Sequence, residues 1–294
     1  MFRNRAIRFM AVAATAFLLA AASADAALAA KKRPDAPGDA VLIVAFGTSF
    51  EKARASYDAL EREVRKSCPG KDIRWAWTAH SLLGAGPGGS RMLSPQEALA
   101  RLATEGVKNV DILSLHVIPG QEYSNLAATA RAFEGLPKGL ERVRVSPPLL
   151  WDTQSMGDTA ALLLRSLPQA RKADEGVVFV GHGTHHPAGV YYGALQYYLG
   201  RLDANVFVGT VEGDPDFDAV LGALRAKKLK RVWLVPLMTV AGDHASNDLF
   251  GDEKDSWKQR FAAAGLTVET VRRGLGEVPE IAGRWVEGLT RLAD

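Results

Sequence analysis

The sequence predicts an α/β protein made of two similar domains, each with a four-stranded, mainly parallel sheet flanked by helices, and with a cleft between the domains. Two observations support this fold class. Short runs rich in Val, Ile, Leu and Phe alternate along the chain with stretches of helical period. These runs fall into two sets of four, and related strings, Phe46-Gly47-Thr48 and His182-Gly183-Thr184, end the first run of each set. One continuous eight-stranded sheet is the alternative.

The composition excludes several classes of protein. The 294-residue chain has 47% hydrophobic and 23% charged residues, an ordinary globular balance that rules out a disordered, collagen-like or coiled-coil protein. Cys68 is the single cysteine, so an internal disulfide and a cysteine-based zinc or iron–sulfur site are both excluded. The net charge of +3 is too small to indicate a nucleic-acid partner.

Residues 1–29 have the layout of a cleaved secretory signal peptide. Three arginines precede an uncharged, alanine-rich run over residues 9–24, and small-residue triplets such as Ala27-Leu28-Ala29 follow it. The run is shorter than the roughly 20 apolar residues that cross a bilayer, so we expect cleavage and no stable membrane insertion. We therefore expect an exported protein, periplasmic in a Gram-negative bacterium, whose residues 30–40 form a flexible leader.

Eight strands are expected, each rich in β-branched or aromatic residues. The polar segment over residues 168–175 is the weakest boundary, so we divide the chain into an N-terminal domain over residues 41–170 and a C-terminal domain over residues 171–294. The expected strands cover residues 41–46, 73–78, 110–117 and 143–150 in the first domain, and residues 177–180, 206–211, 232–240 and 266–271 in the second.

Helix signals lie between these strands. Over residues 50–66, apolar side chains recur at spacings of four, three and four, which predicts a helix with one apolar face. Thr48 with Glu51 fits a capping box at its start. Ser94 with Glu97 fits a second capping box, which predicts that another helix begins there.

Three polar side chains, Glu122, His182 and His244, each follow an expected strand. Because the carboxyl ends of parallel strands share one edge of a sheet, residues far apart in sequence can converge there. Two imidazoles and one carboxylate can bind a divalent ion and leave positions open for water or a substrate. Histidines at strand ends are also often structural, so the residues by themselves leave both interpretations open.

Four strings occur in order along the chain: LIVAFGTSF at 42–50, LHVIPGQEY at 115–123, FVGHGTHH at 179–186 and LVPLMTVAGDHASNDL at 234–249. Together they resemble the anaerobic sirohydrochlorin cobaltochelatases, which are class II chelatases related in fold to ferrochelatase. The resemblance implies a duplicated chelatase-like fold whose cleft holds a tetrapyrrole. It also implies that the metal-binding glutamate and histidines of the family fall on Glu122, His182 and His244.

The activity implied by the resemblance is insertion of Co²⁺, and also of Fe²⁺, into sirohydrochlorin with release of two protons, as in cobalamin or sirohaem metabolism. A neutral imidazole suits the removal of an N–H proton. The resemblance implies that His182 is the general base, with Glu122 and His244 as metal-holding partners, and it leaves open that one histidine serves both roles in succession. The divalent ion is then a substrate, no organic cofactor is required, and bound haem is left open. Because tetrapyrrole assembly is expected in the cytoplasm, the export signal supports a second hypothesis, a periplasmic carrier of metal, haem or another tetrapyrrole.

The substrate is rimmed by carboxylates, so its pocket is expected to offer N–H groups at helix starts and a few cations. Thr48, Ser49 and Arg54 lie at or near the expected start of the first helix, and His185 and His186 follow the second glycine-rich string. We interpret all five as substrate-binding candidates, although Thr48 and Ser49 also fit simple helix caps. The expected partners are the tetrapyrrole and the ion, and a homo-oligomer is compatible with the sequence.

Overall fold

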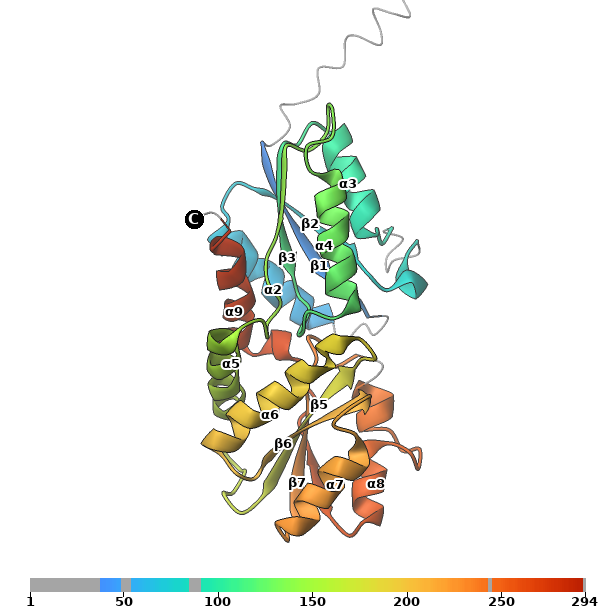
Figure 1. Cartoon of the computed structure of the whole chain (residues 1–294), viewed down its shortest axis with the longest axis vertical. Helices are drawn as coiled ribbons and strands as arrows, with labels where there is room; N and C mark the ends of the chain where they lie inside the picture. Colours follow the sequence, from blue (N-terminus) through green and yellow to red (C-terminus); the bar gives the residue numbers. More distant parts are fainter. Residues whose placement is uncertain (1–37, 49–53, 85–90, 243–244, 293–294) are drawn as a thin grey trace, which may run out of the picture. The chain divides into compact units, whose positions relative to one another are not determined.

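The computed structural model describes residues 38–48, 54–84, 91–242 and 245–292 (Figure 1). These residues belong to one compact unit, Pro37–Asp294. The predicted signal peptide and residues 30–37 of the predicted leader lie outside the described residues. The leader was predicted to reach residue 40, but Asp39 and Ala40 already belong to the first strand, where they pair with its neighbours. None of the helices within the described ranges is long and apolar enough to cross a membrane.

Two separate four-stranded parallel sheets confirm the predicted fold class and exclude the continuous sheet. The first sheet has the order β2-β1-β3-β4, and the second has the order β6-β5-β7-β8. Each is parallel throughout, and the first strand of each half lies in the interior of its sheet between the second and third. The strands are β1 Asp39–Ala45, β2 Asp72–Trp77, β3 Asn109–Ser114, β4 Arg142–Val145, β5 Gly176–Gly183, β6 Val206–Glu212, β7 Arg231–Pro236 and β8 Thr267–Thr270.

The helices lie between these strands along the chain, as the alternating pattern predicts. The longer helices are α2 Arg54–Ser67, α3 Pro95–Thr104, α4 Gln121–Phe133, α5 Thr153–Arg165, α6 Val190–Leu202, α7 Phe217–Ala226, α8 Trp257–Ala263 and α9 Pro279–Thr290. The short ones are η2 His80–Leu82, η4 Pro187–Gly189, η5 Ala245–Leu249 and η6 Leu275–Glu277. At α3 the predicted capping box is confirmed, because Ser94 accepts from the Glu97 backbone and the Glu97 carboxylate accepts from the Ser94 backbone. Glu51, the partner predicted for Thr48, lies outside the described residues.

Several strand ends differ from the prediction. The strands β3, β4 and β7 end at Ser114, Val145 and Pro236, earlier than expected. In β4 the reason is local, since Pro147 and Pro148 have no N–H to donate to a neighbouring strand. Strand β5 is instead longer than expected and continues through Gly183, because that residue still pairs with β6.

Alternate residues of the central strands face two different hydrophobic cores. In β1, Leu42 packs on the side of α3 and α4, whereas Ile43 packs on the side of α2 and α9. In β5, Val178 packs on the side of α7 and α8, whereas Phe179 belongs to the same core as Ile43. Because all four side chains are fully buried, both faces of each sheet are covered.

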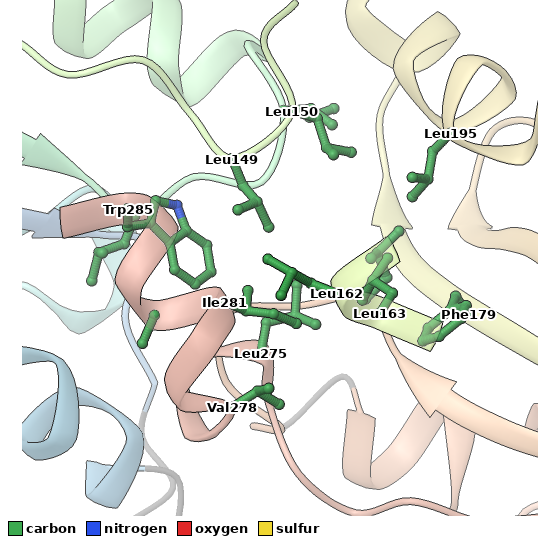
Figure 2. Close-up of a cluster of buried hydrophobic side chains, with 14 of the residues drawn as sticks. Leu149, Leu150, Leu162, Leu163, Phe179, Leu195, Leu275, Val278, Ile281 and Trp285 are labelled. Carbon is green, nitrogen blue, oxygen red and sulfur yellow. The ribbon is translucent and has the colours of Figure 1, made fainter. Parts of the chain in front are cut away.

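The core shared by the two halves is built around α5 and α9 (Figure 2). Helix α9 is the last helix of the chain, yet it packs against β3 and α2 of the first half, while α5 packs against α6 and α9. Arg284 of α9 forms an ion pair with Asp158 of α5 at 3.0 Å. The boundary predicted between residues 170 and 171 therefore separates the two sheets but not the helices that cover them.

Candidate active site

A cavity of about 810 Å³ lies where the carboxyl ends of β1, β3, β5 and β7 lead into loops. This volume is in the usual range for small-molecule and cofactor sites. Both halves contribute to its wall, as expected for parallel sheets whose loops gather at one edge. The described residues that line it include residues 46–48, 115–118, 120–123, 182–187 and 237–240.

Two of the three predicted metal ligands line this cavity. Glu122 comes from the first half and His182 from the second, so the predicted convergence is observed for this pair. His244 lies outside the described residues, and Gly242 shortly before it in sequence also lines the cavity. When only the described residues are considered, no group of three His, Cys, Asp or Glu side chains could hold a metal ion. The complete ligand set therefore stays a prediction.

The two glycines beside His182 are required by close backbone packing. A Cβ on Gly181 would lie 2.4 Å from the ring of Tyr192, and a Cβ on Gly183 would lie 1.7 Å from the carbonyl oxygen of Glu212. Gly183 also has a φ of +87°, which glycine adopts at little cost. The two glycines thus allow the end of β5 to pack closely against α6 and β6, and this packing fixes the position of His182 on the cavity wall.

The ring of His182 contacts the backbone of its own loop. Its Nδ1 lies 3.3 Å from the carbonyl oxygen of Gly183, which can only accept a hydrogen bond. This contact favours the tautomer with hydrogen on Nδ1 and places the lone pair on Nε2. A histidine that binds a metal commonly has this arrangement, in which a backbone carbonyl accepts from the other ring nitrogen.

Glu122 lies in the first turn of α4. Gly120, the N-cap residue, supplies no side-chain cap, and the carboxylate of Glu122 is the acidic group nearest the positive end of the helix dipole. Glu122 is partly buried, and in the described part of the chain no donor or cation contacts its carboxylate. A partly buried carboxylate without a protein partner, facing a cavity, is suited to accept a cation.

His116 is a partly buried wall residue, and the burial of its Nε2 atom was not evident from the sequence. Its Nδ1 lies 2.8 Å from Ser114 Oγ, and its Nε2 is buried with no hydrogen-bond partner among the residues that the structure describes. Burial lowers the pKa of His116 to about 4, so the ring stays neutral at physiological pH. Its carbonyl oxygen accepts from Trp285 Nε1 at 3.2 Å, which ties the loop before α4 to α9.

The two halves anchor equivalent glycine turns with equivalent tyrosines. The hydroxyl of buried Tyr192 accepts from the Gly183 backbone at 3.3 Å, and that of buried Tyr57 is hydrogen-bonded by the Gly47 backbone. Burial raises the pKa of both tyrosines, so both hydroxyls stay protonated near neutral pH. Gly47 has a φ of +112° and therefore also lies in the left-handed region. The duplicated strings seen in the sequence are thus a duplicated structural element.

Only some of the predicted substrate-binding residues lie in the part of the chain that the structure describes. Thr48, His185 and His186 line the cavity, whereas Ser49 and the side chain of Arg54 lie outside the described residues. His186 Nδ1 accepts from the Ala188 backbone at 3.1 Å, so a neutral His186 carries its hydrogen on Nε2 as a donor. None of the described residues of the cavity wall is Lys or Arg, and the side chain of Arg54 is not among them, so the expected cations stay a prediction.

A family model and two related sequences match this chain, and all three are described as cobalt chelatases. Residues 39–293 match the family model described as cobalt chelatase (CbiK). The chain is 37% identical over 253 residues to the sirohydrochlorin cobaltochelatase CbiKC of Nitratidesulfovibrio vulgaris, covering 85% of this chain and 89% of that protein. It is 35% identical to the sirohydrochlorin cobaltochelatase of Salmonella typhimurium, covering 85% of this chain and 94% of that protein.

Solved structures support the fold. The structure of CbiX, described as the terminal enzyme for biosynthesis of siroheme in denitrifying bacteria, has a TM-score of 0.53 at 19% identity and covers 86% of this chain and 98% of its own. SirB from Bacillus subtilis with Fe³⁺ has a TM-score of 0.55 at 12% identity and covers 86% of this chain and 94% of its own. At these identities the likeness concerns the arrangement of strands and helices.

Proposed function

The chain belongs to the cobalt chelatase (CbiK) family, and on that premise we propose that this enzyme inserts Co²⁺ into sirohydrochlorin with release of two protons. The observation that carries the proposal is that Glu122 and His182, from different halves of the molecule, line one cavity of about 810 Å³. A carboxylate and an imidazole facing the same space can hold a divalent ion next to a bound macrocycle.

We propose that the ion is held by His182 Nε2, by the Glu122 carboxylate and by His244. The tautomer favoured by Gly183 directs the lone pair of His182 to Nε2, and Glu122 has no described protein partner to displace. Three protein ligands replace part of the water bound to the ion and leave a face open for the ring. The role of His244 rests on the sequence alone.

Two ring N–H protons must leave as the ion enters the ring. One lone pair cannot hold the ion and accept a proton at once, so we propose that His182 acts in succession. Its Nε2 first binds the ion and then, once the ring nitrogens have replaced it as ligands of the ion, takes one proton, while the Glu122 carboxylate, released from the ion at the same stage, takes the other. The carbonyl oxygen of Gly183 continues to accept from Nδ1 in the resulting imidazolium.

We also propose that Fe²⁺ is a second substrate, because an imidazole and carboxylate donor set accepts both ions. The mature enzyme is proposed to act in the periplasm after loss of residues 1–29, on the strength of the arginine-rich start and the alanine-rich run. Recovery of the protein in a periplasmic extract, with an N-terminus near residue 30 by Edman sequencing, is the expected result. Cytoplasmic protein that keeps residues 1–29 would contradict it.

The test is a titration of the purified protein with sirohydrochlorin and Co²⁺, followed by absorbance. An enzyme converts many equivalents per protein, whereas a periplasmic carrier of tetrapyrrole or metal stops near one. We expect His182→Ala to lower the rate by about a hundredfold or more, since general-base contributions alone are of this size.

His80→Ala is the matched control, because His80 is exposed and does not line the cavity. We expect it to keep wild-type turnover. Equal turnover by the His182→Ala and His80→Ala proteins would contradict the assignment of the site.

A further inference from the structure

Phe46 is a large apolar residue in an unusual place. It directly follows β1, it lines the cavity, and 48% of its surface is exposed. The five residues that precede it in β1 are all fully or almost fully buried. A single exposed apolar side chain is common on protein surfaces, but one at the wall of a binding cavity is available for a ligand.

Phe46 occupies in the first half the position that His182 occupies in the second. Each residue precedes a glycine with positive φ, and the backbone N–H of that glycine hydrogen-bonds to a buried tyrosine. Phe46 directly follows β1, and His182 is the second-last residue of β5, so both lie at the carboxyl end of an interior strand. The duplicated unit therefore carries an imidazole at one copy of this position and a phenyl ring at the other, and both line the same cavity.

The backbone of Phe46 is held firmly although its ring is not covered. Its carbonyl oxygen accepts from the Ala79 backbone at 3.0 Å, and the carbonyl oxygen of Ala45 accepts from Thr78 at 3.0 Å. The next residue, Gly47, packs so closely on Leu82 that a Cβ there would lie 2.7 Å from its side chain. The ring thus projects from a rigid base, which lowers the entropy that is lost when a ligand covers it.

We propose that Phe46 is a macrocycle-contacting residue: its ring packs against the face of the bound tetrapyrrole and holds the ring over the ion held from Glu122 and His182. This inference rests on the proposed function. A flat conjugated ligand offers an extended π face, and aromatic rings pack on such faces in offset or edge-on geometry. Leu82, Ile118 and Val240 also line the cavity and are apolar, so the wall offers further area to the face of a flat ligand.

The experiment separates ring binding from ion binding. Metal-free sirohydrochlorin is titrated into the full-length protein and followed by absorbance, and Co²⁺ is titrated separately without the tetrapyrrole. We expect Phe46→Ala to weaken sirohydrochlorin binding about tenfold or more, and Phe46→Leu to weaken it less, since leucine restores the apolar area but not the aromatic contact. Co²⁺ binding is expected to stay unchanged in both variants.

Tyr197→Ala is the matched control, because Tyr197 is an aromatic residue with 60% exposure that does not line the cavity. It is expected to bind sirohydrochlorin as the wild type does. Circular dichroism of each variant reports the fold.

The proposal is overturned if Phe46→Ala binds sirohydrochlorin within twofold of the wild type. It is also overturned if Co²⁺ and sirohydrochlorin binding weaken equally, since that result indicates a general disturbance of the cavity. A wild type that binds the tetrapyrrole without inserting Co²⁺ contradicts the proposed function, while a loss of binding in Phe46→Ala then still supports the role of Phe46. A wild type that binds no sirohydrochlorin overturns both.

Discussion

Replacing Trp285 with alanine is expected to lower the free energy of unfolding by about 3–5 kcal/mol, the usual cost of truncating a buried aromatic side chain. Trp285 is 1% exposed and lies on α9 within the core shared by the two halves (Figure 2). Its indole packs where the last helix of the chain meets the first sheet. The truncation therefore opens a cavity at the contact that joins the two halves.

Trp285→Phe separates packing from hydrogen bonding. It removes the bond from Nε1 to the His116 carbonyl oxygen, but that oxygen also accepts from the Leu149 backbone at 3.0 Å and is not left without a donor. The lost bond should therefore cost about 1 kcal/mol, and the smaller ring adds a similar amount. We expect the phenylalanine variant to lose about 2 kcal/mol, clearly less than the alanine variant.

The assay is equilibrium unfolding in urea followed by far-ultraviolet circular dichroism, supported by thermal melts. For a chain of this size, the alanine variant should melt roughly 10 °C below the wild type. Leu202→Ala is the control, since Leu202 is 57% exposed and its truncation should change stability by less than about 0.5 kcal/mol. A cost below about 1 kcal/mol for Trp285→Ala would refute the packing of α9 against the first half.

Two further predictions concern the cavity wall. Gly183→Ala should lower the free energy of unfolding by about 2 kcal/mol or more and also lower chelatase activity, because the added Cβ meets the Glu212 carbonyl oxygen and the φ of this residue is +87°. The control is Gly193→Ala, which should stabilise the protein slightly, because Gly193 is an exposed helical glycine with nothing within 4 Å of an added Cβ. Equal urea midpoints for the two variants would contradict this prediction. Burial lowers the pKa of His116 to about 4 in the folded protein, against an ordinary value of 6.5, so between these pH values the unfolded chain binds a proton on His116 that the folded protein does not. The free energy of unfolding should therefore fall by about 3 kcal/mol as the pH drops from above 6.5 to 4. His116→Gln should lack this component, and parallel urea-derived stability profiles for the two proteins would exclude it.

Local signals in the sequence were sufficient for most of the secondary structure. The capping box at Ser94 and Glu97, and the alternation of strands with helices, depend on residues close together in the chain. The sequence predicts the ends of β3 and β7 too late, because apolar residues after them, such as Val240, continue the hydrophobic pattern while they line the cavity. A run of buried residues has the same appearance in sequence whether it pairs with a strand or lines a cavity.

The candidate site was predicted in part. The convergence of Glu122 and His182 followed from the shared edge of parallel strands, and the structure places both on one cavity. The sequence identifies Phe46 only as part of a motif, because the exposure of its ring depends on how distant segments pack around it. The duplicated Phe46-Gly47-Thr48 and His182-Gly183-Thr184 strings were the signal that could have pointed to it.

The sequence by itself determined the duplication of the α/β unit and the family to which the chain belongs, because both depend on local periodicity and on short sequence motifs. Only the tertiary structure decided that α9 returns to the first half, that the Nε2 atom of His116 is buried and that the Phe46 ring is exposed. The physical reason is that burial is a relation between surfaces distant in the chain. The amphipathic pattern of α9 shows that one face must be covered, but it does not show which sheet covers it.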